Sequence, residues 1–145
     1  NNNTYCQDNE LTWLKWELNE EQQASLDFVK QVSRIWQQHP VFQRRRWFHG
    51  RKVRGTDVSD IGWFKADGEQ MTDADWQAGY ARTVGVFLNG RAIPTPDHRG
   101  EPIIDDSFYL LFNAHHEPLD FKLPTCPWGD KWEKVIKTAD VKVES

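Results

Sequence analysis

The clearest pattern of hydrophobic and polar positions lies between residues 20 and 38. At 100° per residue, one face of this stretch is apolar and the opposite face carries charged and amide side chains. The apolar face consists of Ala24, Phe28, Val29, Val32, Ile35 and Trp36. Asn19 is suited to be the N-cap, with Gln22 in the capping-box position, and Pro40 disfavours helical backbone before it. The pattern predicts an amphipathic helix over residues 20–38 with one buried face.

Beyond Pro40 the apolar segments shorten to strand length, and Gly, Pro and Asp residues separate them. The expected strands are 61–64, 83–88, 107–113, 118–123, 132–137 and 141–143. The nearly continuous apolar run at 107–113 predicts a central strand buried on both faces. Asn89-Gly90 is a favoured tight-turn pair, and residues 72–76 resemble one capped helical turn. One helix followed by short strands indicates a junction of two architectures, with the boundary at residues 40–50.

Composition leaves two interpretations of this pattern open. The 145 residues match one domain in length, but only 38% are hydrophobic and the mean hydropathy is −0.78. The aromatic content of 13%, with eight Trp, argues against disorder, because each indole can bury a large apolar area. The chain is therefore either a small, polar, Trp-rich domain or part of a larger protein that covers some of its surface.

Charge and cysteine content narrow the expected partners and location. The net charge is −4 and the isoelectric point is about 5.7, so no general attraction to nucleic acid or membranes is expected. No apolar run reaches the roughly 20 residues of a membrane span, and no targeting segment is visible. Two Cys residues far apart suggest neither a disulfide framework nor a zinc site. These features predict a cytoplasmic protein without a metal or other cofactor.

A basic cluster interrupts this acidic chain. Its cations are Arg44, Arg45, Arg46, Arg51, Lys52 and Arg54, with Trp47, Phe48 and His49 between them. No acidic residue occurs from Phe28 to Thr56. Such a strip can bind single-stranded nucleic acid, or its Arg side chains can pair with carboxylates across an interdomain seam. An isolated strip on an acidic protein favours the seam.

Three further groups have simpler interpretations than catalysis or metal binding. His115-His116-Glu117 resembles a metal site, but adjacent strand residues point to opposite faces, which favours an ordinary polar turn. Asp105-Asp106 could be a general acid and base, yet its place at a strand entrance favours a role in a turn. Cys126 lacks an activating neighbour and is expected to be inert.

The first ten residues, NNNTYCQDNE, are unusually polar. The side chains of residues 5 and 7–10 (Tyr5, Gln7, Asp8, Asn9 and Glu10) offer donors and acceptors of the kind that hold sugar hydroxyls, and aromatic rings stack on pyranose rings. From composition alone, a sugar-facing loop and a polar linker are equally good interpretations.

Several blocks in order resemble glycogen debranching enzymes of the isoamylase type, within the α-amylase family of glycoside hydrolases. The resemblance covers almost the whole chain. The blocks are NNNTYCQDNELTW from Asn1, FQRRR from Phe42, IGWF from Ile61 with DGE from Asp67, Met71-Thr72-Asp73 through Trp76, and DDSF from Asp105 leading to LFNAHHEP from Leu111.

This resemblance implies an α+β chain made of two parts. Residues 1–43 would be the last active-site-side loop and the last helix of a (β/α)8 barrel, and residues 44–145 an antiparallel β-sandwich, possibly incomplete. The implied partners are a branched α-glucan and the missing N-terminal barrel of the same protein, without nucleic acid or membrane. Tyr5, Gln7, Asp8 and Asn9 become the candidate substrate-binding residues.

The family's three catalytic carboxylates lie earlier in its sequences, and none of their motifs occurs here, so no catalytic residue is carried over. We therefore expect a fragment that is inactive alone, truncated before Asn1 and perhaps after Ser145, whose parent hydrolyses α-1,6 branch linkages in glycogen-like glucans with retention. The alternative is a stand-alone carbohydrate-binding β-sandwich module with aligned, solvent-facing indoles.

Overall fold

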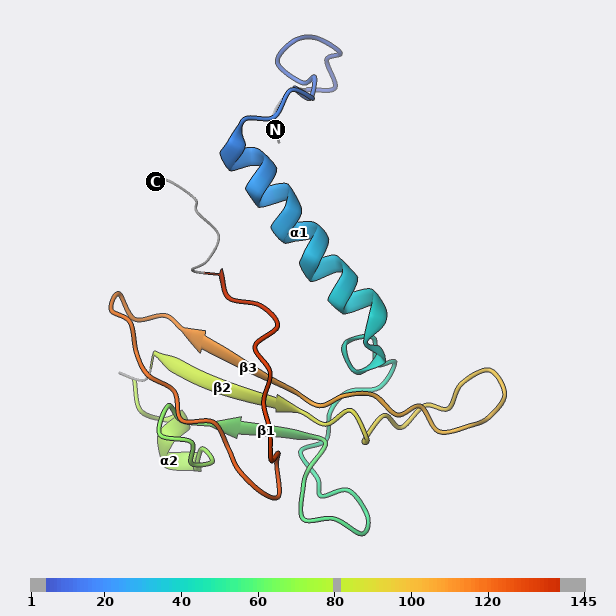
Figure 1. Ribbon diagram of the computed structural model, residues 1–145, viewed down its shortest axis with the longest axis vertical. Helices are drawn as coiled ribbons and strands as arrows, with labels where there is room; N and C mark the ends of the chain where they lie inside the picture. The colour runs from blue at the N-terminus through green and yellow to red at the C-terminus, as the bar shows by residue number, and fades with distance from the viewer. Residues whose placement is uncertain (1–4, 80–81, 139–145) are drawn as a thin grey trace. The chain divides into compact units, whose positions relative to one another are not determined.

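The computed structural model describes residues 5–79 and 82–138 (Figure 1). These residues divide into two compact units, one of 5–34 with 135–138 and one of 35–134. The elements in chain order are α1 (Glu20–Gln38), the 3-10 helix η1 (Pro40–Phe42), β1 (Ile61–Phe64), α2 (Asp73–Trp76), β2 (Thr83–Leu88) and β3 (Phe108–Asn113).

Helix α1 has the bounds that the sequence predicts, and its capping box is formed. The Asn19 side-chain oxygen accepts the backbone N–H of Gln22 at 2.8 Å, and the Gln22 side chain accepts that of Asn19 at 3.1 Å. The predicted burial is not observed, since no residue of α1 is buried and Val29 and Val32 are 56% and 41% exposed. Amphipathic helices gain most of their stability by packing their apolar face, so this face is a surface available for packing.

The three strands form one antiparallel sheet in the order β1-β2-β3 (Figure 1). The expectation that 107–113 is a central strand buried on both faces is wrong. Within residues 5–79 and 82–138, β3 pairs only with β2 and is an edge strand, in which Leu111 and Phe112 are 44% and 53% exposed. The central strand is β2, and an apolar run by itself does not reveal which strand takes that position.

Each face of the sheet carries its own small core. On one face Phe64 and Phe87, both 1% exposed, pack with Val58, Tyr109 and the indoles of Trp128 and Trp132. On the other face, η1 packs on the sheet, and its Val41 is buried together with Val86 and Leu88. Alternation along β2 produces this division, since its successive side chains point to opposite faces.

The chain after β3 differs from the prediction. Residues 118–123 and 132–137 are not strands, and 141–143 lie outside the described residues. Instead, this segment crosses the sheet without regular structure (Figure 1), and the Trp128 ring lies 5.0 Å from those of Phe64 and Phe87, centroid to centroid. The Trp132 indole donates to the Pro124 carbonyl at 2.9 Å. This segment therefore contributes two half-buried indoles to the core on the sheet, and it adds no strand within the described residues.

Two local predictions on either side of β2 are confirmed as turns. Thr72 and Asp75 form a capping box at the start of α2. Asn89 and Gly90 begin a turn in which the Ala92 N–H donates to the Asn89 carbonyl at 3.1 Å. That turn does not close a tight hairpin, because the chain continues through an irregular loop before entering β3.

One close approach within the sheet explains a glycine. A Cβ on Gly85 would lie 2.1 Å from the Tyr109 hydroxyl oxygen, so the phenol occupies the space above the glycine. That hydroxyl is buried and has no hydrogen-bond partner among the described residues. Burial raises the pKa of Tyr109 to about 12, because the phenolate loses its hydration there.

Candidate functional site

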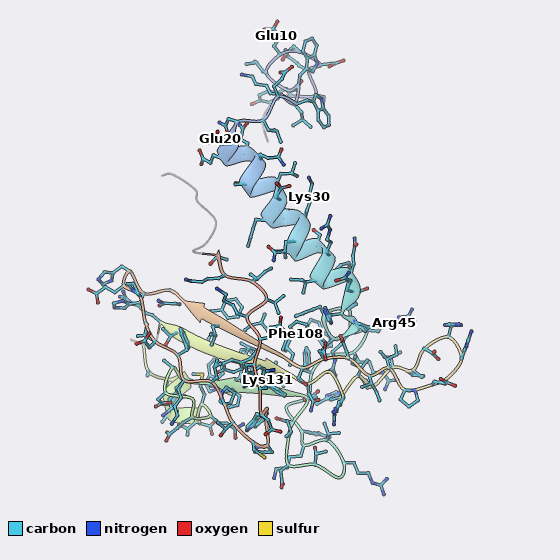
Figure 2. The ribbon with its side chains drawn as sticks, in the orientation of Figure 1. Glu10, Glu20, Lys30, Arg45, Phe108 and Lys131 are labelled. Carbon is cyan, nitrogen blue, oxygen red and sulfur yellow. The ribbon has the colours of Figure 1, made fainter. Side chains whose placement is uncertain are left out.

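The sugar-facing candidates lie in the N-terminal loop, whose tip carries Glu10 (Figure 2). A hollow of about 450 Å³ opens on this loop. Its lining residues are Asp8, Asn9, Glu10, Leu11 and Trp13. Among the predicted site residues, the loop therefore brings Asp8 and Asn9 to one hollow, and it leaves Tyr5 and Gln7 outside the lining.

Asn9 and Gln7 hold the loop in shape. The Asn9 side-chain oxygen accepts the Leu11 N–H at 3.1 Å, and its amide nitrogen donates to the Gln7 side-chain oxygen at 3.1 Å. The Thr12 hydroxyl donates to the carbonyls of Gln7 and Asn9 at 2.9 and 2.8 Å. Asx-type bonds of this kind favour turns over helix or strand. Most of the Asn9 side chain's capacity is thus used inside the loop, and it positions its neighbours.

Asp8 and Trp13 form the polar and aromatic sides of the hollow. The Trp13 indole N–H donates to one carboxylate oxygen of Asp8 at 2.5 Å, and the Trp13 side chain remains 60% exposed. The bond fixes the carboxylate and leaves its second oxygen available to accept a hydroxyl proton donor. An anchored carboxylate beside an open indole face can hold a sugar by hydrogen bonding and stacking.

Tyr5 and Cys6 adopt an uncommon backbone conformation. Their φ angles are 48° and 57°, in the left-handed region that residues other than glycine rarely occupy. Tyr5 is 86% exposed, so its phenol is open to solvent. Backbone strain of this kind collects at binding and active sites, which makes these two positions candidates for function.

The sequence did not indicate Trp13 as a lining residue, whereas Glu10 was among the polar side chains that it offered. The usable signal was a Trp in the apolar stretch that directly follows the polar loop, five positions after Asp8. Only the fold of the loop brings that indole back onto the carboxylate.

Asp105 has the structural role expected of a turn residue. Its carboxylate accepts the backbone N–H of Val41 at 3.0 Å and lies 2.8 Å from the His39 ring nitrogen Nδ1. It also accepts the N–H of Asp106 at 2.8 Å, whereas Asp106 is exposed. Asp105 thus joins the segment after α1 to the loop that enters β3, and the two carboxylates do not form a catalytic pair.

The His115-His116-Glu117 segment is a bend, as expected of a polar turn. The two rings stack at 4.3 Å with an interplanar angle of 28°, so both nitrogen lone pairs lie in nearly parallel planes. A metal ion must lie in the plane of each imidazole that binds it, and such stacked rings do not converge on one ion. His115 Nδ1 also accepts the Glu117 N–H at 3.1 Å.

None of the helices in the described part of the chain is long and apolar enough to cross a membrane.

Comparison with known proteins identifies related sequences. Residues 60–144 match the family described as "Isoamylase, C-terminal". A "Glycogen operon protein GlgX homolog" of Mycobacterium tuberculosis is 44% identical over 141 residues, which cover 97% of this chain and 20% of that protein. A "Glycogen debranching enzyme" of Dickeya chrysanthemi is 32% identical over 128 residues, or 88% of this chain and 16% of that protein. The chain spans about a fifth of the length of the curated relatives it matches.

Proposed function

The chain belongs to the isoamylase C-terminal family, and from this premise we propose that it is the C-terminal part of an enzyme that hydrolyses α-1,6 branch linkages in glycogen-like glucans. The observation that carries the proposal is the match of residues 60–144 to this family, together with the two relatives, one named as a glycogen operon protein and one as a glycogen debranching enzyme, that match along most of the chain. The substrate is a branched α-glucan, and the partner is the N-terminal barrel of the same polypeptide.

We propose that residues 1–43 complete a (β/α)8 barrel and that residues 44–145 form the β-sandwich domain. The exposed apolar stripe of α1 supports the first assignment, because a barrel helix covers its sheet with such a stripe. The antiparallel sheet of β1, β2 and β3 supports the second, as one layer of a sandwich. The reduced cysteines Cys6 and Cys126 agree with a cytoplasmic location.

The N-terminal loop then faces the substrate, since loops that follow barrel strands line the active site. Tyr5, Gln7, Asp8 and Asn9 are the glucan-facing residues in this proposal. Asp8 accepts a sugar hydroxyl, Tyr5 offers its exposed ring and hydroxyl, and Gln7 and Asn9 maintain the loop through their mutual hydrogen bond. The retaining mechanism requires two carboxylates about 5 Å apart in the barrel, and this chain provides neither.

A paired assay tests the proposal. The 145-residue chain and the product of the complete reading frame that encodes it are incubated with a branched glucan, and linear chains released are measured as reducing ends. We expect turnover only from the complete protein. Clear turnover by the 145-residue chain, or none by a folded complete protein, would refute it. Saturable glycogen binding by the chain alone would favour a carbohydrate-binding module instead.

Replacing Asp8 with alanine in the complete protein is expected to lower kcat/KM for a branched glucan by about 10- to 100-fold, because an anchored acceptor near the substrate is lost. Steady-state kinetics on the same glucan provides the measurement. Glu17→Ala is the control, since Glu17 is an exposed carboxylate outside the hollow and should leave kcat/KM within about twofold of wild type. Equal losses in the two variants would remove Asp8 from the site.

A further inference from the structure

Five arginines between residues 44 and 54 form a strip with a large excess of positive charge, here called the arginine strip. They are Arg44, Arg45, Arg46, Arg51 and Arg54. All except Arg44 are exposed, and within the described chain no carboxylate pairs with those four. The neighbouring Lys52 differs, because it pairs with Asp57 at 2.9 Å. Unpaired like charges so near one another in the sequence tend to repel each other, and an anionic partner would offset that repulsion.

The guanidinium of Arg44 is buried and only partly hydrogen-bonded within the described part of the chain. Its side chain is only 4% exposed, and its guanidinium carbon lies 3.9 Å from the centre of the Phe48 ring. One nitrogen contacts Asp60 at 3.4 Å, a long contact. Nε and Nη1 have no hydrogen-bond partner among the described residues. Burial lowers the pKa of the guanidinium, and the nearby Asp60 carboxylate only partly opposes this.

Asp60 is shared between the guanidinium and the backbone. Its two carboxylate oxygens already accept the backbone N–H groups of His49 and Gly50, each at 2.9 Å. A guanidinium has five donors in a planar fork that matches a carboxylate in bidentate fashion. A buried guanidinium with one long contact therefore indicates an incomplete binding arrangement.

Trp47 stands in the middle of the strip and is 89% exposed. Arg and Trp are the residue types enriched at the energetic centres of protein interfaces. Residues 43–50, which include the Arg45 labelled in Figure 2, form neither helix nor strand, so this segment can adjust to a partner surface. The combination fits a protein surface that offers carboxylates around a pocket for one indole.

We propose that the arginine strip and Trp47 dock onto an acidic surface of the remaining part of the same polypeptide. This inference rests on the proposed function, in which the chain is about a fifth of a longer enzyme. The strip is positively charged although the chain as a whole has a net charge of −4. Its charge is therefore complementary to a partner surface that carries carboxylates. Docking would pair the exposed arginines of the strip with carboxylates and cover Trp47 in one step.

The test uses the complete protein with the double substitution Arg45→Glu and Arg46→Glu. Its matched control is Arg91→Glu with Arg99→Glu, two exposed arginines in the loop between β2 and β3. We expect limited chymotrypsin cleavage after Trp47 or Phe48 to become at least about tenfold faster in the strip variant and to stay within about twofold in the control. High salt should accelerate cleavage of the wild type in the same segment, because screening weakens the contact.

Hydrogen exchange of the wild type keeps the proposal testable if the variant does not fold. Amides of residues 44–50 should exchange at least about tenfold more slowly in the complete protein than in the 145-residue chain, with the β2 amides as the internal reference. Equal exchange in the two proteins would overturn the docking surface, as would strip and control variants that are cleaved alike.

Two other results separate this inference from its alternatives. A labelled single-stranded DNA 20-mer that binds the complete protein, with affinity lost in the strip variant and exchange unprotected, would assign the strip to nucleic acid and overturn the proposal. A complete protein that protects the strip but releases no linear chains from a branched glucan would refute the proposed activity and leave the docking surface standing.

Discussion

Replacing Gly90 with alanine is expected to lower the free energy of unfolding by about 3 kcal/mol. A Cβ at this position would lie 2.1 Å from the carbonyl oxygen of Asp106 and 2.3 Å from that of Asp105. Both atoms belong to the backbone, so they cannot turn aside as a flexible side chain would. The Asp105 N–H also donates to the Gly90 carbonyl at 3.0 Å, and the chain segments that lead out of β2 and into β3 would have to separate.

Urea unfolding followed by tryptophan fluorescence measures this effect as a lower midpoint at an unchanged slope. Gly79→Ala is the matched control, because a Cβ at Gly79 meets nothing within 4 Å. The control should remain within about 0.5 kcal/mol of wild type. A Gly90 variant as stable as the Gly79 variant would show that the turn after β2 opens at little cost.

Replacing Asp105 with alanine is expected to cost about 2 to 3 kcal/mol. Val41 is 1% exposed, and its backbone N–H has the Asp105 carboxylate as its acceptor at 3.0 Å. The variant leaves this donor buried without a partner and also removes the contact with the His39 ring at 2.8 Å. A buried unsatisfied donor costs more than the hydrogen bond contributed net.

The adjacent Asp106 supplies the control for this change. Asp106→Ala removes an exposed carboxylate from the same turn and should change the unfolding free energy by no more than about 0.5 kcal/mol. Thermal unfolding by near-ultraviolet circular dichroism compares the two variants. Should they lose stability equally, Asp105 acts through the turn as a whole and its bond to Val41 is dispensable.

The sequence predicted which polar groups the candidate site offers, but only in part how these groups are arranged. The donors and acceptors of Asp8 and Asn9 are visible in the sequence, and both line the hollow. The sequence could not show that Asn9 uses its side chain inside the loop or that Trp13 returns to donate to Asp8. These features depend on the path of the backbone, which includes left-handed conformations at Tyr5 and Cys6.

The local elements were determined by the sequence itself. Helix α1, its capping box, the capped turn α2 and strands β1 and β2 follow from side-chain period and from caps that act over three or four residues. The caps and the helical period act over three or four residues and are present in the sequence as spacing, whereas β1 and β2 also depend on pairing with each other.

The tertiary structure alone decided which strand is central, which predicted strands are absent and which charges are paired. β2 is central because β1 and β3 both hydrogen-bond to it, and the irregular segment after β3 packs Trp128 and Trp132 against the sheet. Asp105 and Val41, like Arg44 and Asp60, are partners only because the fold brings them together. Such contacts join positions far apart in the chain, and a pattern of neighbouring residues contains no record of them.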